Sequence, residues 1–180
     1  MPTPAQNTIL KALAAADPTA QAWVNDATAD DQALADWLNT PTTNYIWKTF
    51  TPSDDVFNEI VGANMTPVDA PDGTTLWTNR ALMCQAKQLN IQTLLQGKDR
   101  LATSKANIRN TLSDALLNVP SGVNGATQSA GWAGVKTVIS RIATRAEVAL
   151  ATGTGTKASP ATPAWEGIIS PGEASSVRVA

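Results

Sequence analysis

Two pairs of adjacent carboxylates are the first candidates for chemistry in this chain. They are Asp30-Asp31 and Asp54-Asp55, and neighbouring carboxylates can ligate a cation or act as general acid and base. Each pair stands where a helix is predicted to begin. Capping of free amides and a favourable interaction with the helix dipole therefore explain both pairs, and neither has a second carboxylate cluster at the spacing of a metal-binding loop.

The remaining reactive positions are few, because the chain has no histidine and a single cysteine, Cys84. The lack of histidine excludes Ser-His-Asp and Cys-His catalysis and histidine-ligated zinc. Cys84 falls among apolar residues of a predicted helix, which favours a buried and inert thiol. The Gly-Thr-Gly segment at 153–155 lacks the strand, the helix and the further glycine of a phosphate-binding loop. The sequence therefore predicts no catalytic residue, no cofactor site and no metal site.

The composition is low in charge. Only 16% of residues are charged, the formal net charge is -2 and the sequence pI is about 5.0. A surface with few charges gives weak protection against association, which favours a protein that works with partners. No basic run is present, so broad electrostatic binding of nucleic acid is not expected. With neither a signal peptide nor a run of roughly 20 apolar residues, we expect a soluble protein made in a reducing cytoplasm, without membrane contact.

The longest element predicted is a helix over residues 75–96. Turn-forming residues at 71–73 precede it, Thr74 or Thr75 would cap it, and Gly97 would end it. Its apolar residues form two sectors on a helical wheel, whereas a surface helix has one, so we expect it to be covered from two directions. The second cover is either another helix of this chain or a neighbouring subunit. The wide sector contains Leu76, Trp77, Ala81, Met83, Cys84, Ile91, Leu94 and Leu95; the narrow sector, the candidate interface, contains Leu82, Ala86 and Leu89.

Shorter elements are predicted on both sides of this helix. Residues 45–50 (YIWKTF) are aromatic and β-branched and favour a strand or an extended connector. The last predicted helix carries Arg141, Arg145 and Glu147, which either pair with one another or a neighbour, or form a solvated face. Apolar spacings of three and four predict helices over about 5–16, 19–27, 30–38, 53–61, 104–118 and 132–150.

The last part of the chain, residues 151–180, differs in character. Residues 151–160 are rich in glycine, threonine, serine and alanine, which is typical of a flexible tether. The rest shows little periodicity and has an apolar patch at Trp165, Ile168 and Ile169. A segment of this kind is not expected to bury itself, so we interpret the patch as an anchor for a partner.

Two stretches of the chain resemble a known family. They are APDGTTLWTNRALMCQAKQLNIQTLLQGKDRLATSKANIRNTLSDAL and RIATRAEVALATGTGTKASPATPAWEGIISPGE. Together they are similar to a family of small proteins of tailed bacteriophages that are encoded among the virion structural genes. The resemblance covers roughly residues 70–173 and implies a component of the virion. No catalytic motif of that family is carried over to this sequence.

These observations predict a mainly α-helical fold, a small helical bundle around a long central helix, with a helical domain over 1–150 and an extended C-terminal arm over 151–180. The expected function is that of a head-to-tail connector, an adaptor or head-completion subunit that assembles as a homo-oligomeric ring on the portal of the virion. DNA would pass nearby without specific binding. The alternatives are a capsid cement or decoration protein, another tail protein, a virion-associated enzyme and a DNA-binding terminase-like accessory.

Overall fold

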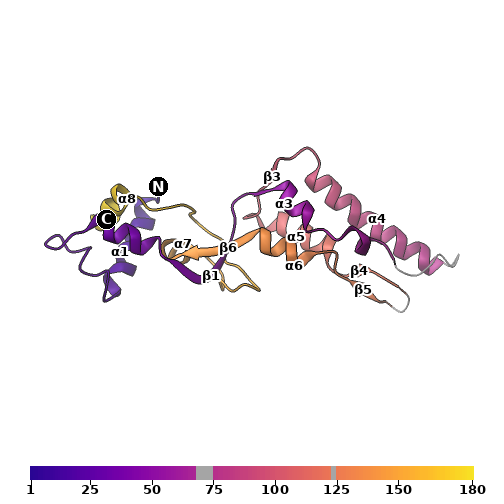
Figure 1. Cartoon of the computed structure of the whole chain (residues 1–180), viewed down its shortest axis with the longest axis horizontal. Helices are drawn as coiled ribbons and strands as arrows, with labels where there is room; N and C mark the ends of the chain where they lie inside the picture. The colour runs from indigo at the N-terminus through magenta and orange to yellow at the C-terminus, as the bar shows by residue number, and fades with distance from the viewer. Residues whose placement is uncertain (68–74, 123–124) are drawn as a thin grey trace. The chain divides into compact units, whose positions relative to one another are not determined.

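The computed structural model describes residues 1–67, 75–122 and 125–180 (Figure 1). The chain separates into two compact units. Unit 1 consists of Met1–Trp47 and Ser140–Ala180, and unit 2 consists of Lys48–Ile139, so unit 2 is inserted into the chain of unit 1. This division differs from the expected boundary between residues 150 and 151. The turn and cap expected at 71–74 lie outside the described residues.

The fold is mixed α/β, and the expected mainly α-helical bundle around a long central helix is wrong. The described structure is 49% helical and 14% strand, with small antiparallel sheets. The helix predicted over 132–150 is divided into α6 (Trp132–Val138), strand β6 (Ser140–Thr144) and α7 (Arg145–Leu150). Thr144 and Glu147 form a capping box that starts α7. Because a capping box satisfies free amides at a helix start, it outweighs the continuous apolar periodicity and places extended backbone before it.

Unit 1 gathers four helices around one core: α1 (Pro4–Ala16), α2 (Asp31–Leu38), α7 and α8 (Pro171–Arg178). Helices α1 and α8 also begin at capping boxes, Thr3 with Gln6 and Ser170 with Glu173, and each has a proline in its first turn. The helix predicted over 5–16 is thereby confirmed. The buried residues of this core are Leu10, Ala14, Ala20, Leu34, Ala35, Trp37, Leu38, Ala146, Leu150, Ile169, Ala174 and Val177.

A two-stranded antiparallel sheet lies beside this core. Strand β1 (Pro41–Trp47) pairs with β6, and Tyr45 stands opposite Ile142. The segment after α7 also bonds to β1: the Tyr45 N–H donates to the Gly155 carbonyl at 2.7 Å, and the Ala161 N–H donates to the Tyr45 carbonyl at 2.8 Å. The strand predicted at 45–50 therefore exists, although it begins earlier and ends at Trp47.

The C-terminal segment is not a free arm, and that expectation is wrong. Ile169, Ala174 and Val177 are buried in the core of unit 1, and α8 packs on α1 and α2. Arg178, at the end of α8, forms an ion pair with Asp31 at 3.0 Å. The segment buries itself because its last residues form a short capped helix whose apolar side chains recur three apart, a spacing that places them on one face.

Unit 2 contains α3 (Ser53–Asn58), the 3-10 helix η1 (Gly62–Met65), α4 (Thr75–Leu95), α5 (Ala106–Leu116) and α6. Two short antiparallel pairs join its segments: β2 (Thr51–Pro52) with β3 (Arg100–Leu101), and β4 (Val119–Pro120) with β5 (Thr127–Gln128). The helices predicted over 75–96 and 104–118 are confirmed. Its buried apolar residues are Val56, Met65, Cys84, Ile91, Leu94, Leu101, Leu112, Ala115, Leu116, Val119, Ala130, Val135 and Ile139.

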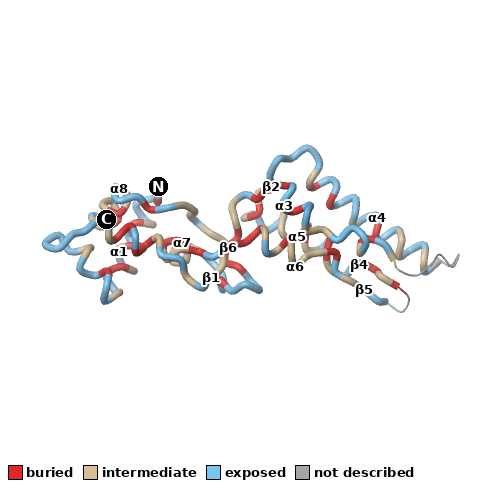
Figure 2. The backbone as a smooth tube through the Cα atoms, viewed as in Figure 1, coloured by how far each residue is buried: buried red, intermediate tan, exposed pale blue. Residues whose placement is uncertain are grey.

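The long helix α4 is covered on one side by the described residues. It packs on α5 and β4 and buries Cys84, Ile91 and Leu94. Much of the rest of its surface is exposed, as the pale blue stretches of the tube show (Figure 2). Four large apolar side chains of α4 are each more than half exposed: Leu76, Leu82, Met83 and Leu89. The described part of this chain therefore leaves the narrow sector, with Leu82 and Leu89, without the cover that the sequence predicts. Leu76 and Met83 of the wide sector are exposed as well.

Unit 2 also has a position that only glycine satisfies. Gly131 precedes α6 with a φ of 100°, and a Cβ there would lie 2.0 Å from the carbonyl oxygen of Glu59. Both the left-handed backbone and the close approach of the chain after α3 require the absence of a side chain.

Candidate functional site

The interface residues predicted in the C-terminal segment differ in exposure. Ile168 is 78% exposed, whereas Ile169 is 1% exposed and belongs to the core of unit 1. Trp165 is partly buried and packs against the same core. Ile168 is therefore the residue of the predicted anchor that stands fully at the surface, and Ile169 stabilises the fold instead.

The interface residues predicted on α4 are all exposed. Leu82 and Leu89 are more than half exposed, and Ala86 lies between them on the same face of the helix. Their contact with another subunit stays a prediction, because the structure contains one chain.

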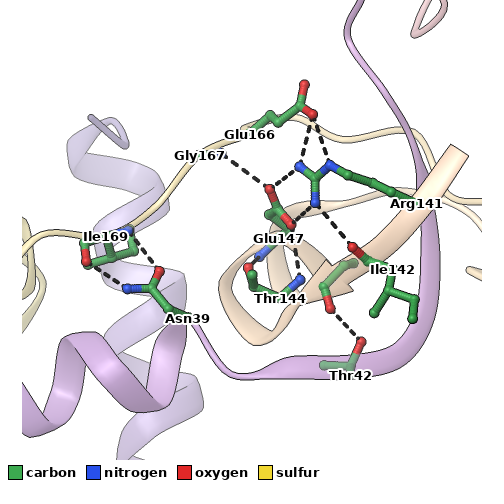
Figure 3. A network of polar contacts seen from close by, with 10 residues as sticks. Asn39, Thr42, Arg141, Ile142, Thr144, Glu147, Glu166, Gly167 and Ile169 are labelled. Atoms are coloured by element: carbon green, nitrogen blue, oxygen red, sulfur yellow. Dashed lines mark hydrogen bonds and ion pairs between the residues drawn. The ribbon is translucent and has the colours of Figure 1, made fainter. Parts of the chain in front are cut away.

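A buried ion pair holds the backbone that leads to Ile168 (Figure 3). Arg141 Nη2 lies 2.5 Å from Oε1 of Glu147, whose side chain is 1% exposed. The same guanidinium nitrogen lies 2.9 Å from Oε1 of Glu166, and the Gly167 N–H donates to Glu147 at 3.2 Å. One guanidinium thus joins two carboxylates, and the pair connects β6, α7 and the C-terminal segment.

The charged state of this pair follows from its hydrogen bonds. Burial opposes ionisation of Glu147, but hydrogen bonds from Arg141, Thr144 and Gly167 outweigh it, so the pKa of this carboxyl lies below its usual value. Hydrogen bonds to Glu147, opposed by burial and helped by Glu166, raise the pKa of Arg141. Both groups are therefore ionised at neutral pH, and the buried carboxylate accepts hydrogen bonds from Arg141, Thr144 and Gly167 (Figure 3).

The structure decides between the two interpretations that the sequence left open for Arg141, Arg145 and Glu147, which were pairing and a solvated helix face. Arg141 and Glu147 pair with each other, so they do not form a solvated helix face. Arg145 lies elsewhere, with its guanidinium carbon 4.6 Å from the centre of a Trp37 ring and Nη1 3.6 Å from Asp17 Oδ2. The burial of Glu147 had one local signal in the sequence, the Thr-x-x-Glu pattern of its capping box.

A second set of contacts holds the backbone on the other side of Ile168. The Asn39 side chain donates to the carbonyl oxygen of Ile169 at 2.8 Å and accepts a hydrogen bond from its N–H, also at 2.8 Å (Figure 3). Ile168 therefore stands between two residues whose backbone is held by side chains of unit 1. An exposed apolar side chain on a held backbone loses less entropy on binding than one on a mobile loop.

Unit 2 has a hollow of about 540 Å³ between α4 and the segment of α3 and η1, which we call the α3–α4 groove. Its apolar walls come from both segments. Three glutamines spaced four residues apart line it as well, two in α4 and the third just after its end. Gln88 donates to the Met65 carbonyl at 2.8 Å. An apolar hollow with a few amides can receive an apolar side chain together with its polar backbone. The lining residues are Phe57, Ile60, Gly62, Met65, Gln88, Ile91, Gln92, Leu95 and Gln96.

Of the residues first considered for chemistry, Asp30 and Cys84 have structural contacts. The predicted capping role of Asp54-Asp55 is wrong, because α3 has no side-chain cap, although both acids lie in its first turn, where the helix dipole favours them. Asp30 caps α2 by accepting the Ala33 N–H at 2.9 Å, as predicted. The thiol of Cys84 is buried and lies 3.4 Å from the Pro120 carbonyl oxygen, and burial raises its pKa, against a smaller opposite effect of Lys87. Among the described residues, no group of three or more histidine, cysteine, aspartate or glutamate side chains is placed to hold a metal ion.

No protein-family model, curated protein or solved structure matches this chain. Exposure and shape give three candidate sites: the exposed side of α4, the held Ile168 and the α3–α4 groove. In the described part of the chain, none of the helices has both the length and the apolar character needed to cross a membrane.

Proposed function

We propose that this protein is a structural subunit of a tailed bacteriophage virion, at the head-to-tail connection, where copies form a ring against the portal. The observation that carries the proposal is the exposed apolar side of α4. Leu82 and Leu89 lie on one face of that helix, and both are more than half exposed. Large apolar side chains gathered on one surface favour a contact with another protein.

The size of this surface suits a contact that is repeated. Burying a large aliphatic side chain contributes about 1.5–3 kcal/mol, and these side chains are already partly covered. Two or three of them give a weak contact between two copies. In a closed ring every subunit makes the contact twice, and the linked contacts reinforce one another.

Three further observations support the proposal. The resemblance to virion structural proteins covers most of unit 2 and part of the C-terminal segment. The charged share of 16% suits a subunit that is permanently associated. The net charge of -2 suits a ring through which DNA passes without being bound. The proposed role is assembly, not catalysis, in a protein made in the host cytoplasm and carried in the virion.

The contact with the next layer cannot come from a free C-terminal arm. Residues 169–177 contribute three side chains to the core of unit 1, so that segment is committed to the fold. The proposed contacts with neighbouring copies and the portal therefore use exposed surfaces, of which the α4 face is the main one.

A nonsense allele of this gene in its phage tests the proposal. We expect DNA-filled heads and separate tails in electron micrographs, because the joint between them is missing. Tailed particles with fragile shells would instead indicate a cement protein and overturn the connector role. Infectious tailed particles that lack the chain would overturn any structural role.

A complementation experiment connects that result to α4. Leu89→Asp supplied in trans should fail to restore tailed particles, because it places a charge on the proposed contact. Asn90→Asp is the matched control, since it introduces the same charge at a neighbouring exposed and polar position of the helix. Equal complementation by both variants would remove α4 from the argument.

A further inference from the structure

We propose that Ile168 of one copy inserts into the α3–α4 groove of a second copy, so that copies join head to tail. The inference rests on the proposed assembly into a ring and adds a second contact between neighbouring copies to the one proposed for the exposed face of α4. Each copy supplies the protruding residue from unit 1 and the groove from unit 2.

Ile168 protrudes on a backbone held at both sides. Gly167 donates its N–H to the buried Glu147, and both backbone groups of Ile169 bond to Asn39. Gly167 itself has a φ of 155°, and a Cβ there would lie 3.1 Å from the Trp165 ring. The contacts that hold Ile169 in the core of unit 1 thus also fix the backbone from which one large apolar side chain stands in solvent.

The α3–α4 groove has the size and chemistry to receive this residue. An apolar cavity of about 150 Å³ is enough to hold a benzene molecule, and the groove has a volume of about 540 Å³. It therefore accommodates the four-carbon side chain of isoleucine and part of its backbone. None of its lining residues is charged, and the amides of Gln92 and Gln96 can bond to the peptide groups beside Ile168.

The charges of the two units favour a contact between unlike units of different copies. Unit 1 has five lysine and arginine residues against eight aspartate and glutamate residues, a formal net charge of -3. Unit 2 has eight against seven, a formal net charge of +1. Joining unit 1 of one copy to unit 2 of the next brings opposite charges together, whereas a symmetric contact joins like charges.

This choice of surfaces determines the type of assembly. A contact between two different surfaces of the same chain is heterologous, and it forms a ring when the rotation between copies closes. A self-complementary contact would stop at a dimer. The second copy is therefore the occupant that agrees with both the charges and the proposed ring.

Disulfide trapping between two variants of the full chain tests the contact. Both carry Cys84→Ala, one also carries Ile168→Cys and the other Gln92→Cys. After mixing and mild oxidation we expect a disulfide-linked mixed dimer. Two control mixtures should give little of this dimer. The first mixes Gln92→Cys with Val179→Cys, which replaces another exposed apolar residue of unit 1. The second mixes Ile168→Cys with Asn90→Cys, which lies on the opposite side of α4 from Gln92.

Self-association of the full chain gives a second measurement. Ile168→Asp should weaken association by about ten- to a hundred-fold, the factor that corresponds to burying one isoleucine. Val179→Asp should leave it unchanged. Both variants should keep the circular dichroism and melting temperature of the parent, because the side chains that they replace are exposed.

The outcomes separate this contact from the proposed function. If rings form but the 168–92 disulfide does not, the contact is overturned while the proposed ring assembly still stands. The same holds if Ile168→Asp and Val179→Asp associate equally strongly. A third variant carries both Ile168→Cys and Gln92→Cys. A disulfide that forms within this chain, when none forms between the mixed chains, also overturns the contact. The proposed virion role is overturned only if particles assemble normally without the protein.

Discussion

Replacing Glu147 with glutamine should lower the free energy of unfolding of unit 1 by about 2–3 kcal/mol. Breaking a buried ion pair costs about 3–5 kcal/mol when one charge stays uncompensated. The lower value applies here because the Arg141 side chain is 30% exposed and keeps Glu166 as a partner. Four donor groups bond to the Glu147 carboxylate: two guanidinium nitrogens of Arg141 and the N–H groups of Thr144 and Gly167. A glutamine side chain keeps one acceptor oxygen for these four donors.

Urea unfolding followed by tryptophan fluorescence measures this change. Trp165 packs against the core of unit 1 and lies two residues from Gly167, so its environment reports on the affected segment. Glu166→Gln is the matched control. The Glu166 side chain is 27% exposed and its pairing with Arg141 is partly solvated, so its loss should cost no more than about 1 kcal/mol.

Two results would refute this reasoning. The first is an equal cost for the Glu147 and Glu166 variants, which would mean that burial does not strengthen the pair. The second comes from a double-mutant cycle with Arg141→Met. The coupling energy should be about 1–3 kcal/mol, as for other contacting residues, and a value near zero would show that Glu147 acts only through its capping of α7.

Four more predictions follow from single contacts. The folded-state pKa of Glu147 lies below its ordinary value of 4.5. The stability that this carboxylate contributes is therefore present above pH 4.5 and is lost as the pH falls through the folded-state pKa. The melting temperature of the parent should fall more steeply in acid than that of Glu147→Gln. Gly131→Ala should destabilise unit 2 by more than about 2 kcal/mol, whereas Gly62→Ala, with open space around it, should change urea unfolding by less than about 0.5 kcal/mol. Asn39→Ala should cost about 2 kcal/mol and speed proteolysis of the C-terminal segment. Leu89→Asp should leave the stability of the monomer within about 0.5 kcal/mol but reduce light-scattering mass; unfolding of the monomer would place Leu89 in the core.

The helices with clear ends could be predicted from the sequence. Residues 75–96 lie between turn signals and contain no helix breaker, and α4 occupies almost the same range. The burial of Cys84 followed from its place among the apolar residues of that helix. These predictions succeed because a cap, a proline or a glycine acts on its own few residues, whatever the rest of the chain does.

The predicted fold class is wrong because apolar spacing alone does not show where a capping box interrupts a helix. Residues 132–150 have the periodicity of one helix, yet Thr144 and Glu147 form a capping box inside it. Ser170, Pro171 and Glu173 show the same pattern at the start of α8. Both patterns are readable in the sequence, and the second would have indicated that the C-terminal segment contains a helix able to bury a face.

The amino-acid sequence by itself determined where α1, α2, α4 and α5 begin and end, because those ends depend on hydrogen bonds between residues three or four positions apart. It did not determine α7 and α8, and the helix predicted over 19–27 is a series of turns. The tertiary structure decided which carboxylate is buried, which charge compensates it and which isoleucine stays in solvent. Arg141 and Glu166 are 25 positions apart, and Asn39 and Ile169 are 130 positions apart. Contacts at such separations depend on the path of the whole chain, so no local pattern specifies them, and they are the contacts that create the surface proposed to join one copy to the next.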